Sequence, residues 1–193
     1  MQMFEYVIVL ISIVIGLAVT HLMQGIAGLI QNPLRVRIWW VHLVWVAYMI
    51  LSIVFWWWWE FNLQQIKVWT FPIYLFVIFY AFYLYLISAV LFPTRLEGYD
   101  GYQSYFMARR HWFFGLVIGW AGIDVIDTWM KGAEWFAVVG RDAIVFNSIL
   151  ALTAIIGIAV RRPAVQAILA VGQLVYVLFG LLRLFNLIHF GTT

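Results

Sequence analysis

Two aspartates, Asp124 and Asp127, stand in an otherwise apolar stretch of the chain, WAGIDVIDTW at residues 120–129. An ionised carboxylate is costly in the hydrocarbon of a bilayer, so such residues face protein or water and often handle ions, protons or substrates. On a helix these two side chains point within about 60° of each other. We therefore expect both to face a protein interior or a water-filled cleft.

Other charged residues fall near the same depth. Arg141 and Asp142 begin the next apolar stretch, and Arg183 lies near the end of the last one. The most economical arrangement pairs the two arginines with Asp124, Asp127 or Asp142. Two interpretations stay open: a structural salt-bridge network, or an outer vestibule whose acids attract cations while the arginines neutralise them or bind an anionic group.

A second polar layer is predicted near the middle of the membrane. His21 and Gln24 lie in the first apolar stretch, Asn147 in the fifth and Gln173 in the last. Such groups can be simple interhelical contacts worth about 0.6 kcal/mol each. Alternatively they form the constriction of a permeation path, where a histidine can change charge near neutral pH.

Two histidines also allow a redox interpretation, in which His21 and His42 are the axial ligands of one b-type haem. The sequence has no cysteine, which excludes disulfides and thiolate metal sites. It contains no HExxH, GxSxG or Walker motif. We therefore predict no enzyme activity and no metal site.

The composition sets the environment in which these groups must work. The 193 residues are 66% hydrophobic and 10% charged, and the mean hydropathy is +1.00. Soluble domains carry roughly 25% charged residues. So few charges cannot cover a water-facing surface, so the chain is predicted to be an integral membrane protein with no nucleic-acid partner.

Six apolar stretches are each long enough to cross a bilayer as a helix. They are apolar on all faces, whereas membrane barrel strands alternate. We predict an all-α, polytopic fold in which residues 1–193 form one transmembrane domain. The spans are expected at about 3–30, 38–60, 68–92, 111–130, 135–160 and 164–190.

The loops predict the orientation. Loop 31–37, loop 93–110 and the turn at 161–162 lie on the same side and hold seven of the eleven basic residues. The seven are Arg35, Arg37, Arg95, Arg109, Arg110, Arg161 and Arg162. By the positive-inside rule this side is cytoplasmic, and both termini are then extracytoplasmic. Loop 93–110 is expected to lie as an amphipathic segment on the inner headgroups.

Six spans with this topology divide into two halves of three with opposite orientation, which allows the inverted 3+3 arrangement of many transporters. The function that we predict is a small channel or transporter for an ion or small solute, forming a homo-oligomer in the plasma (bacterial inner) membrane. The alternative is a non-catalytic scaffold or assembly subunit of a larger membrane complex, docking through the aromatic-rich spans 38–60 and 68–92. The haem protein is a third interpretation.

Overall fold

The computed structural model describes residues 3–32, 36–66 and 68–190, with Met3 and residues 183–190 as backbone only. Six α-helices and one short 3₁₀ helix make up the described chain. Their bounds are α1 (Met3–Gln31), α2 (Trp40–Trp59), η1 (Glu60–Gln65), α3 (Phe71–Leu91), α4 (Tyr102–Met130), α5 (Ala133–Ala159) and α6 (Pro163–Phe190). Each of the six α-helices is long and apolar enough to span a membrane. The prediction of an all-α, multi-pass chain is confirmed.

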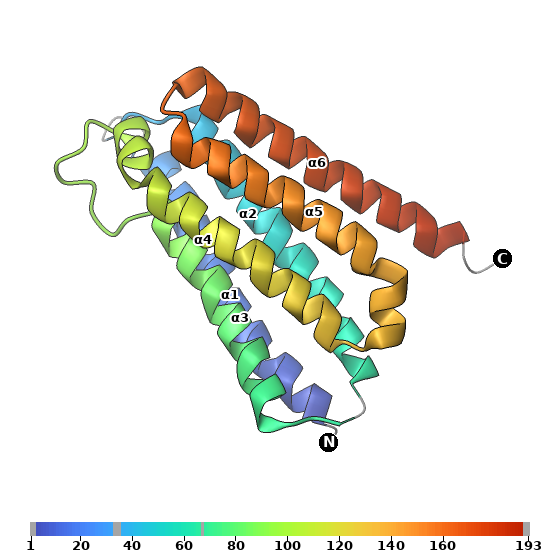
Figure 1. Ribbon diagram of the computed structural model, residues 1–193. Coiled ribbons are helices and arrows are strands. Elements are labelled where there is room, and N and C mark those ends of the chain that lie inside the picture. Colours follow the sequence, from blue (N-terminus) through green and yellow to red (C-terminus); the bar gives the residue numbers. More distant parts are fainter. Residues whose placement is uncertain (1–2, 33–35, 67, 191–193) are drawn as a thin grey trace.

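Successive helices run in opposite directions along one bundle (Figure 1). The closest pairs are α4 with α5 and α1 with α3, and α6 packs along α2. Helix α2 also contacts α1, α3 and α4, so it lies at the centre. The connections at 32–39, 92–101 and 160–162 share one end of the bundle, and those at 60–70 and 131–132 share the other (Figure 1).

The helix ends follow from local chemistry. Proline near the start of α3 (Pro72) and at the start of α6 (Pro163) fits the first turn, where the missing N–H would have no partner anyway. Gly101, with φ 151°, precedes α4 in a backbone conformation that side chains rarely adopt. Helix α4 begins at Tyr102, so the second half of the expected amphipathic connection 93–110 is helical.

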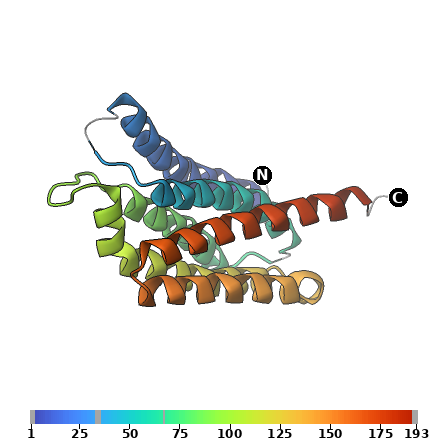
Figure 2. The ribbon, with the colours of Figure 1, turned by 90° about the horizontal axis from the view of Figure 1, so that it is seen from above.

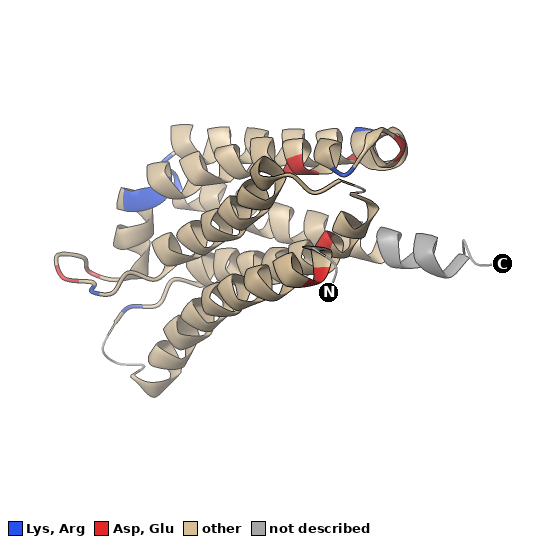
Figure 3. Ribbon diagram, turned by 90° about the horizontal axis from the view of Figure 1, so that it is seen from below, with Lys and Arg blue, Asp and Glu red and all other residues tan. Residues whose placement is uncertain are grey.

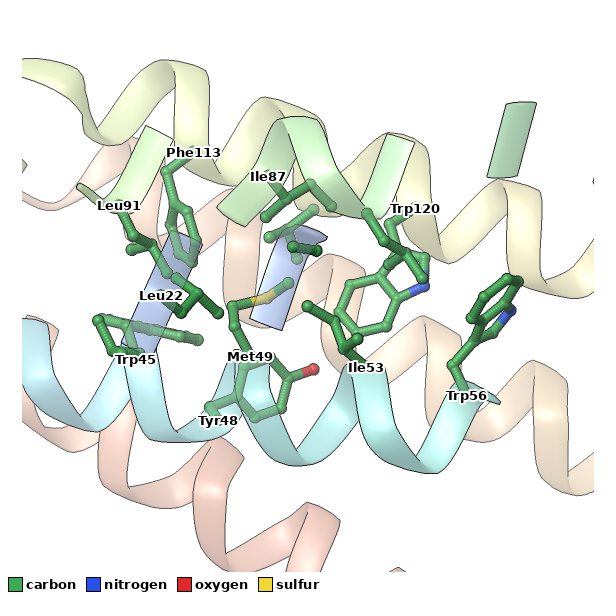
Figure 4. Packing of buried hydrophobic residues seen from close by; sticks show 14 of the residues in the cluster. Leu22, Trp45, Tyr48, Met49, Ile53, Trp56, Ile87, Leu91, Phe113 and Trp120 are labelled. Carbon is green, nitrogen blue, oxygen red and sulfur yellow. The ribbon is translucent and has the colours of Figure 1, made fainter. Parts of the chain in front are cut away.

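The core is built around α2 and is rich in aromatic rings (Figure 4). Trp45 and Met49 are fully buried. The Trp45 ring lies 5.3 Å from the Phe113 ring, centroid to centroid, with an edge-to-face inclination of 67°, which is a favoured aromatic geometry. Trp56, at the far end of α2, also points inward and is 3% exposed. Helix α2 still exposes one stripe of side chains, which includes Trp40, Val54 and Trp58.

The two halves of the chain do not pack alike. In the first half, α1 lies along α3, the first helix against the third. In the second half α4 lies along α5, and in the described residues it does not contact α6. An inverted repeat of two whole three-helix units would show the same pairing twice, so the packing gives that arrangement no support.

Charged residues lie mainly towards the two ends of the bundle (Figure 3). The acidic end carries Glu60, Asp127 and Lys131, which are buried, and Asp124, which is half-buried.

Candidate functional site: a buried charge cluster between η1, α4 and α5

Lys131 is the centre of the site. It directly follows the last residue of α4, and its side chain has no exposed surface. Its ammonium group donates to Oε1 of Glu60, at 2.9 Å, and to Oδ2 of Asp127. Asp127 lies one turn back on α4, whereas Glu60 comes from the junction of α2 and η1. The ion pairs therefore tie the end of α4 to the end of α2.

The environment of Lys131 keeps it charged. Burial lowers the pKa of its ammonium group, but the charges of Asp127 and Glu60 and the hydrogen bonds to them together raise that pKa above its ordinary value. An ammonium between two carboxylates is stabilised more by the pairing than it is penalised by losing water.

Aromatic side chains cover this end of the bundle. In Figure 2 the first turns of α5 are seen end-on while the rest of the helix crosses the view, so these turns lie across the end of the bundle. Trp135, from these turns, packs on Trp59 beside η1, with ring centroids 5.4 Å apart. The cover explains why charged groups near a helix connection have no exposed surface.

Asp124 lies one turn deeper in α4 and has a separate set of partners. Its Oδ1 accepts from the hydroxyl of Tyr80, at 2.6 Å, and its Oδ2 from the amide of Asn147, at 2.7 Å. The indole N–H of Trp120 donates in turn to the Tyr80 hydroxyl, at 2.8 Å. Side chains from α3, α4 and α5 thus converge on one carboxyl group.

Acid exceeds base in this region. Asp124, Asp127 and Glu60 supply three carboxyl groups, and Lys131 is the one ammonium group bonded to any of them in the described residues. Oε2 of Glu60 and Oδ1 of Asp127 are buried with no hydrogen-bond partner there. The two carboxyl groups lie close together, because both bond the same ammonium group of Lys131. Two carboxyl groups can share a hydrogen bond only if one carries a proton.

A second buried polar group lies deeper in the bundle. The hydroxyl groups of Tyr48 and Ser52, both from α2, and the side-chain N–H group of Gln173, from α6, are buried and have no hydrogen-bond partner in the described residues. All three residues are at most 4% exposed. The Tyr48 ring lies 6.2 Å from that of Trp120, centroid to centroid. A line of polar side chains therefore runs from Lys131 towards the middle of the membrane.

The expected pairing of the aspartates with Arg141 or Arg183 stays a prediction, and in the described residues the ion-pair partner of Asp127 is Lys131. Arg141 and Asp142 are exposed on α5. Asn147 on α5 bonds Asp124 on α4, so these two residues lie at the same level. Arg141 precedes Asn147 by as many residues as Met130, the last residue of α4, follows Asp124. Arg141 is therefore level with the last turn of α4. The side chain of Arg183 lies outside the described residues.

The predicted middle layer is not one cluster. Asn147 belongs to the network around Asp124, and Gln173 lies beside Tyr48. His21 and Gln24 line a cleft at the opposite end of the bundle. They are on α1, which does not contact α6 in the described residues, so His21 and Gln173 do not form a shared constriction.

His21 and His42 both bind the C-terminal end of α3. Nε2 of His42 hydrogen-bonds the carbonyl oxygen of Leu91, at 2.7 Å, and Nε2 of His21 that of Phe92, at 3.1 Å. These carbonyl groups have no partner within their own helix. The ring of Tyr102 stacks on His42, with centroids 4.5 Å apart. Each Nε2 would have to leave its carbonyl group to bind a haem iron, so the arrangement favours a structural role for both histidines.

Sequence reasoning missed Glu60, Tyr80 and Lys131 as site residues. The i, i+4 spacing of Asp127 and Lys131 was a usable signal, because oppositely charged residues one turn apart on a helix lie side by side. Nothing in the sequence indicated that Tyr80, from an aromatic-rich helix, faces an acid. In the described residues no group of three or more His, Cys, Asp or Glu side chains could hold a metal ion.

Comparison of the chain with protein-family models, with curated proteins and with solved structures finds no match.

Proposed function

We propose that this protein moves protons across a membrane, with the buried charge cluster as the site that takes them up and releases them. The observation that carries the proposal is the excess of buried carboxyl groups over ammonium groups around Lys131. Burying an unpaired charge is expensive. Bound protons would neutralise the excess and would allow Glu60 and Asp127 to share a hydrogen bond.

A proton suits the site better than a larger ion. A bare Na⁺ or Ca²⁺ needs about six or more oxygen ligands around a central point. Here the carboxyl oxygens already accept from Tyr80, Asn147 and Lys131, and the open positions are single oxygen atoms. Single oxygen atoms can each hold a proton without any rearrangement.

The line of polar side chains supports an inward path. Hydroxyl groups can accept and donate at once, as the Tyr80 hydroxyl does between Trp120 and Asp124. The hydroxyl groups of Tyr48 and Ser52 make no hydrogen bond in the described residues, so in this proposal both are free to accept and donate as a proton passes. In this proposal the constriction of the proton path is formed by the buried residues Tyr48, Ser52 and Gln173. His21 and Gln24, which the sequence predicted at the constriction, do not take part in it. Asp124 lies between this section and the cluster around Lys131.

The orientation belongs to the same proposal. The arginine-rich end, which in the described residues carries Arg37, Arg95, Arg109, Arg110, Arg161 and Arg162, is cytoplasmic by the positive-inside rule. Arg35 lies outside the described residues. The charge cluster would then face the extracytoplasmic side of the plasma membrane. We further expect a homo-oligomer, because α5 and α6 bury the smallest share of their surface within one copy.

The test is proton flux into liposomes that contain the purified protein, a trapped pH-sensitive dye and a membrane potential set by K⁺ and valinomycin. We expect flux above that of empty liposomes, and a drop of about tenfold or more in Asp124→Asn, which keeps the side-chain shape but cannot hold the proton. Glu97→Gln is the matched control, because Glu97 is an exposed acid at the other end of the bundle. Wild-type flux equal to that of empty liposomes would refute the proposal.

The scaffold alternative rests on fewer observations. Of the two predicted docking helices, α2 packs against four other α-helices but exposes Trp40, Val54 and Trp58. Helix α3 keeps an outer stripe of apolar side chains that includes Phe71, Leu75, Phe79 and Phe82. Lipid covers such a stripe as well as a protein partner does. Co-purification of a stoichiometric partner that is lost on substituting this stripe would favour the alternative.

A further inference from the structure

A cleft of about 910 Å³ lies at the arginine-rich end of the bundle, opposite to the charge cluster, and no residue of the cluster lines it. One wall is the last third of α1, from His21 to the end of the helix, and the other is the connection 92–102. Along α1 the cleft extends from His21 to Asn32, which is roughly 16 Å at the helical rise. It therefore reaches from the loops into the membrane-crossing part of α1.

The walls of the cleft are held in place. The backbone N–H of Tyr102 donates to the carbonyl oxygen of Arg37, at 3.0 Å, which joins the two connections. Gly101 allows this approach, because a Cβ there would lie 2.7 Å from the same carbonyl oxygen. On the other side, Gly25 lets the ring of Phe92 lie directly against α1. The cleft is thus built by backbone contacts, with room beside Gly28, where a Cβ would meet nothing within 4 Å.

The lining includes both apolar and charged side chains. Leu29, Phe92 and Leu96 give it apolar surface. In the described part of the chain, the charged lining contains two arginines and two acids: Arg37, Arg95, Glu97 and Asp100. Arg95 and Glu97 form a long, exposed pair of 3.8 Å, and such pairs are weak enough to exchange for a ligand. The last turn of α1 carries no basic side chain, so its carbonyl groups add negative potential.

We propose that the cleft binds the headgroup of a phospholipid that carries both a phosphate and a primary ammonium group. Arginine binds phosphate oxygens in a bidentate geometry, and here Arg37 and Arg95 would bind the phosphate group. The ammonium group would meet Glu97, Asp100 and the end of α1. The apolar wall would hold the start of the acyl chains. The balanced charges of the lining select a zwitterion over an anion, and the acids need a cation that can donate hydrogen bonds.

The experiment is a competition between headgroups. The full-length protein is reconstituted into nanodiscs with equal amounts of phosphatidylethanolamine, phosphatidylcholine and phosphatidylglycerol, extracted in mild detergent, and its retained lipids are counted by mass spectrometry. We expect phosphatidylethanolamine to be enriched roughly fivefold over the other two, which corresponds to about 1 kcal/mol of preference. Phosphatidylcholine shares the phosphate but lacks N–H donors, and phosphatidylglycerol lacks the ammonium group.

Gly28→Leu should abolish the enrichment by filling the cleft. The matched control is Gly16→Leu, the same change on the same helix at a position that also has open space around it and does not line the cleft. Both variants should fold, since neither new side chain meets a neighbouring atom at its Cβ. Arg37→Ala tests the phosphate contact and should lower the enrichment as well.

Three results would overturn the proposal: no preference in the wild type, a preference for phosphatidylglycerol, or an unchanged preference in Gly28→Leu. Displacement of the retained lipid by soluble phosphoethanolamine at equal concentration would also count against a lipid, because a free headgroup lacks the acyl chains that the apolar wall holds. Proton flux plays no part in this test.

Discussion

Replacing Lys131 by methionine gives the sharpest test of the charge cluster. The change removes the ammonium group from between two carboxyl groups but keeps a long side chain of similar shape. Leaving one partner of a buried ion pair without its counter-charge typically costs about 3–5 kcal/mol. For a chain of this size each 1 kcal/mol shifts Tm by about 2–4 °C, so we expect Tm to fall by roughly 6–20 °C.

The assay is thermal unfolding of the purified protein in mild detergent, followed by the loss of helical circular dichroism. A rescue variant combines Lys131→Met with Glu60→Gln and Asp127→Asn, which removes the unpaired carboxylates. It should recover most of the lost Tm, because a neutral buried cluster carries no uncompensated charge. The matched control is Arg95→Met, which breaks an ion pair whose side chains are 78% and 80% exposed and should change stability by about 1 kcal/mol or less.

Two results would refute the reasoning. A Lys131→Met variant with the Tm of the wild type would mean that the cluster is hydrated, not dry. A triple variant no more stable than Lys131→Met would mean that the lysine contributes by packing and not through its charge.

Three further predictions concern pH, hydrogen bonding and packing. The pKa of Lys131 in the folded protein is raised above its ordinary value of 10.5. Its contribution to stability should therefore be fully present below pH 10.5 and be lost as the pH rises through the pKa of the folded state. The Tm difference between the wild type and Lys131→Met should stay constant from about pH 7 to about pH 10, and a decline within that range would contradict the pairing. Tyr80→Phe leaves a half-buried carboxyl oxygen of Asp124 and the buried indole N–H of Trp120 without their partner and should cost about 1–3 kcal/mol in thermal unfolding. Tyr83→Phe, which releases only a backbone carbonyl group inside a helix, should cost less, and equal losses would argue against the network. Gly157→Ala, on α5, puts a methyl group 2.4 Å from the buried ring of Phe114 on α4 and should cost about 1–3 kcal/mol. Gly172→Ala, with open space around it, should stabilise its helix slightly. Tm values of the two variants that move in the same direction would show that α4 and α5 are not packed as described.

The sequence by itself determined the class of fold. Six apolar stretches, each long enough to cross a bilayer, predict six helices, because backbone groups in lipid must be satisfied within the segment. The structure confirms six such helices. The sequence also located Asp124 and Asp127, since an acid in an apolar stretch is conspicuous wherever the helix is packed.

Only the tertiary structure decided the partners of those acids. The helices are apolar on nearly all faces, so periodicity does not show which side of a helix faces protein and which faces lipid. Tyr80 illustrates this, because it is one of many aromatic residues on α3, and only packing against α4 turns its hydroxyl group to Asp124. Glu60 and Lys131 are 71 residues apart and meet because the ends of α2 and α4 lie together. Contact between residues so far apart depends on how whole helices pack, which no local pattern in the sequence records.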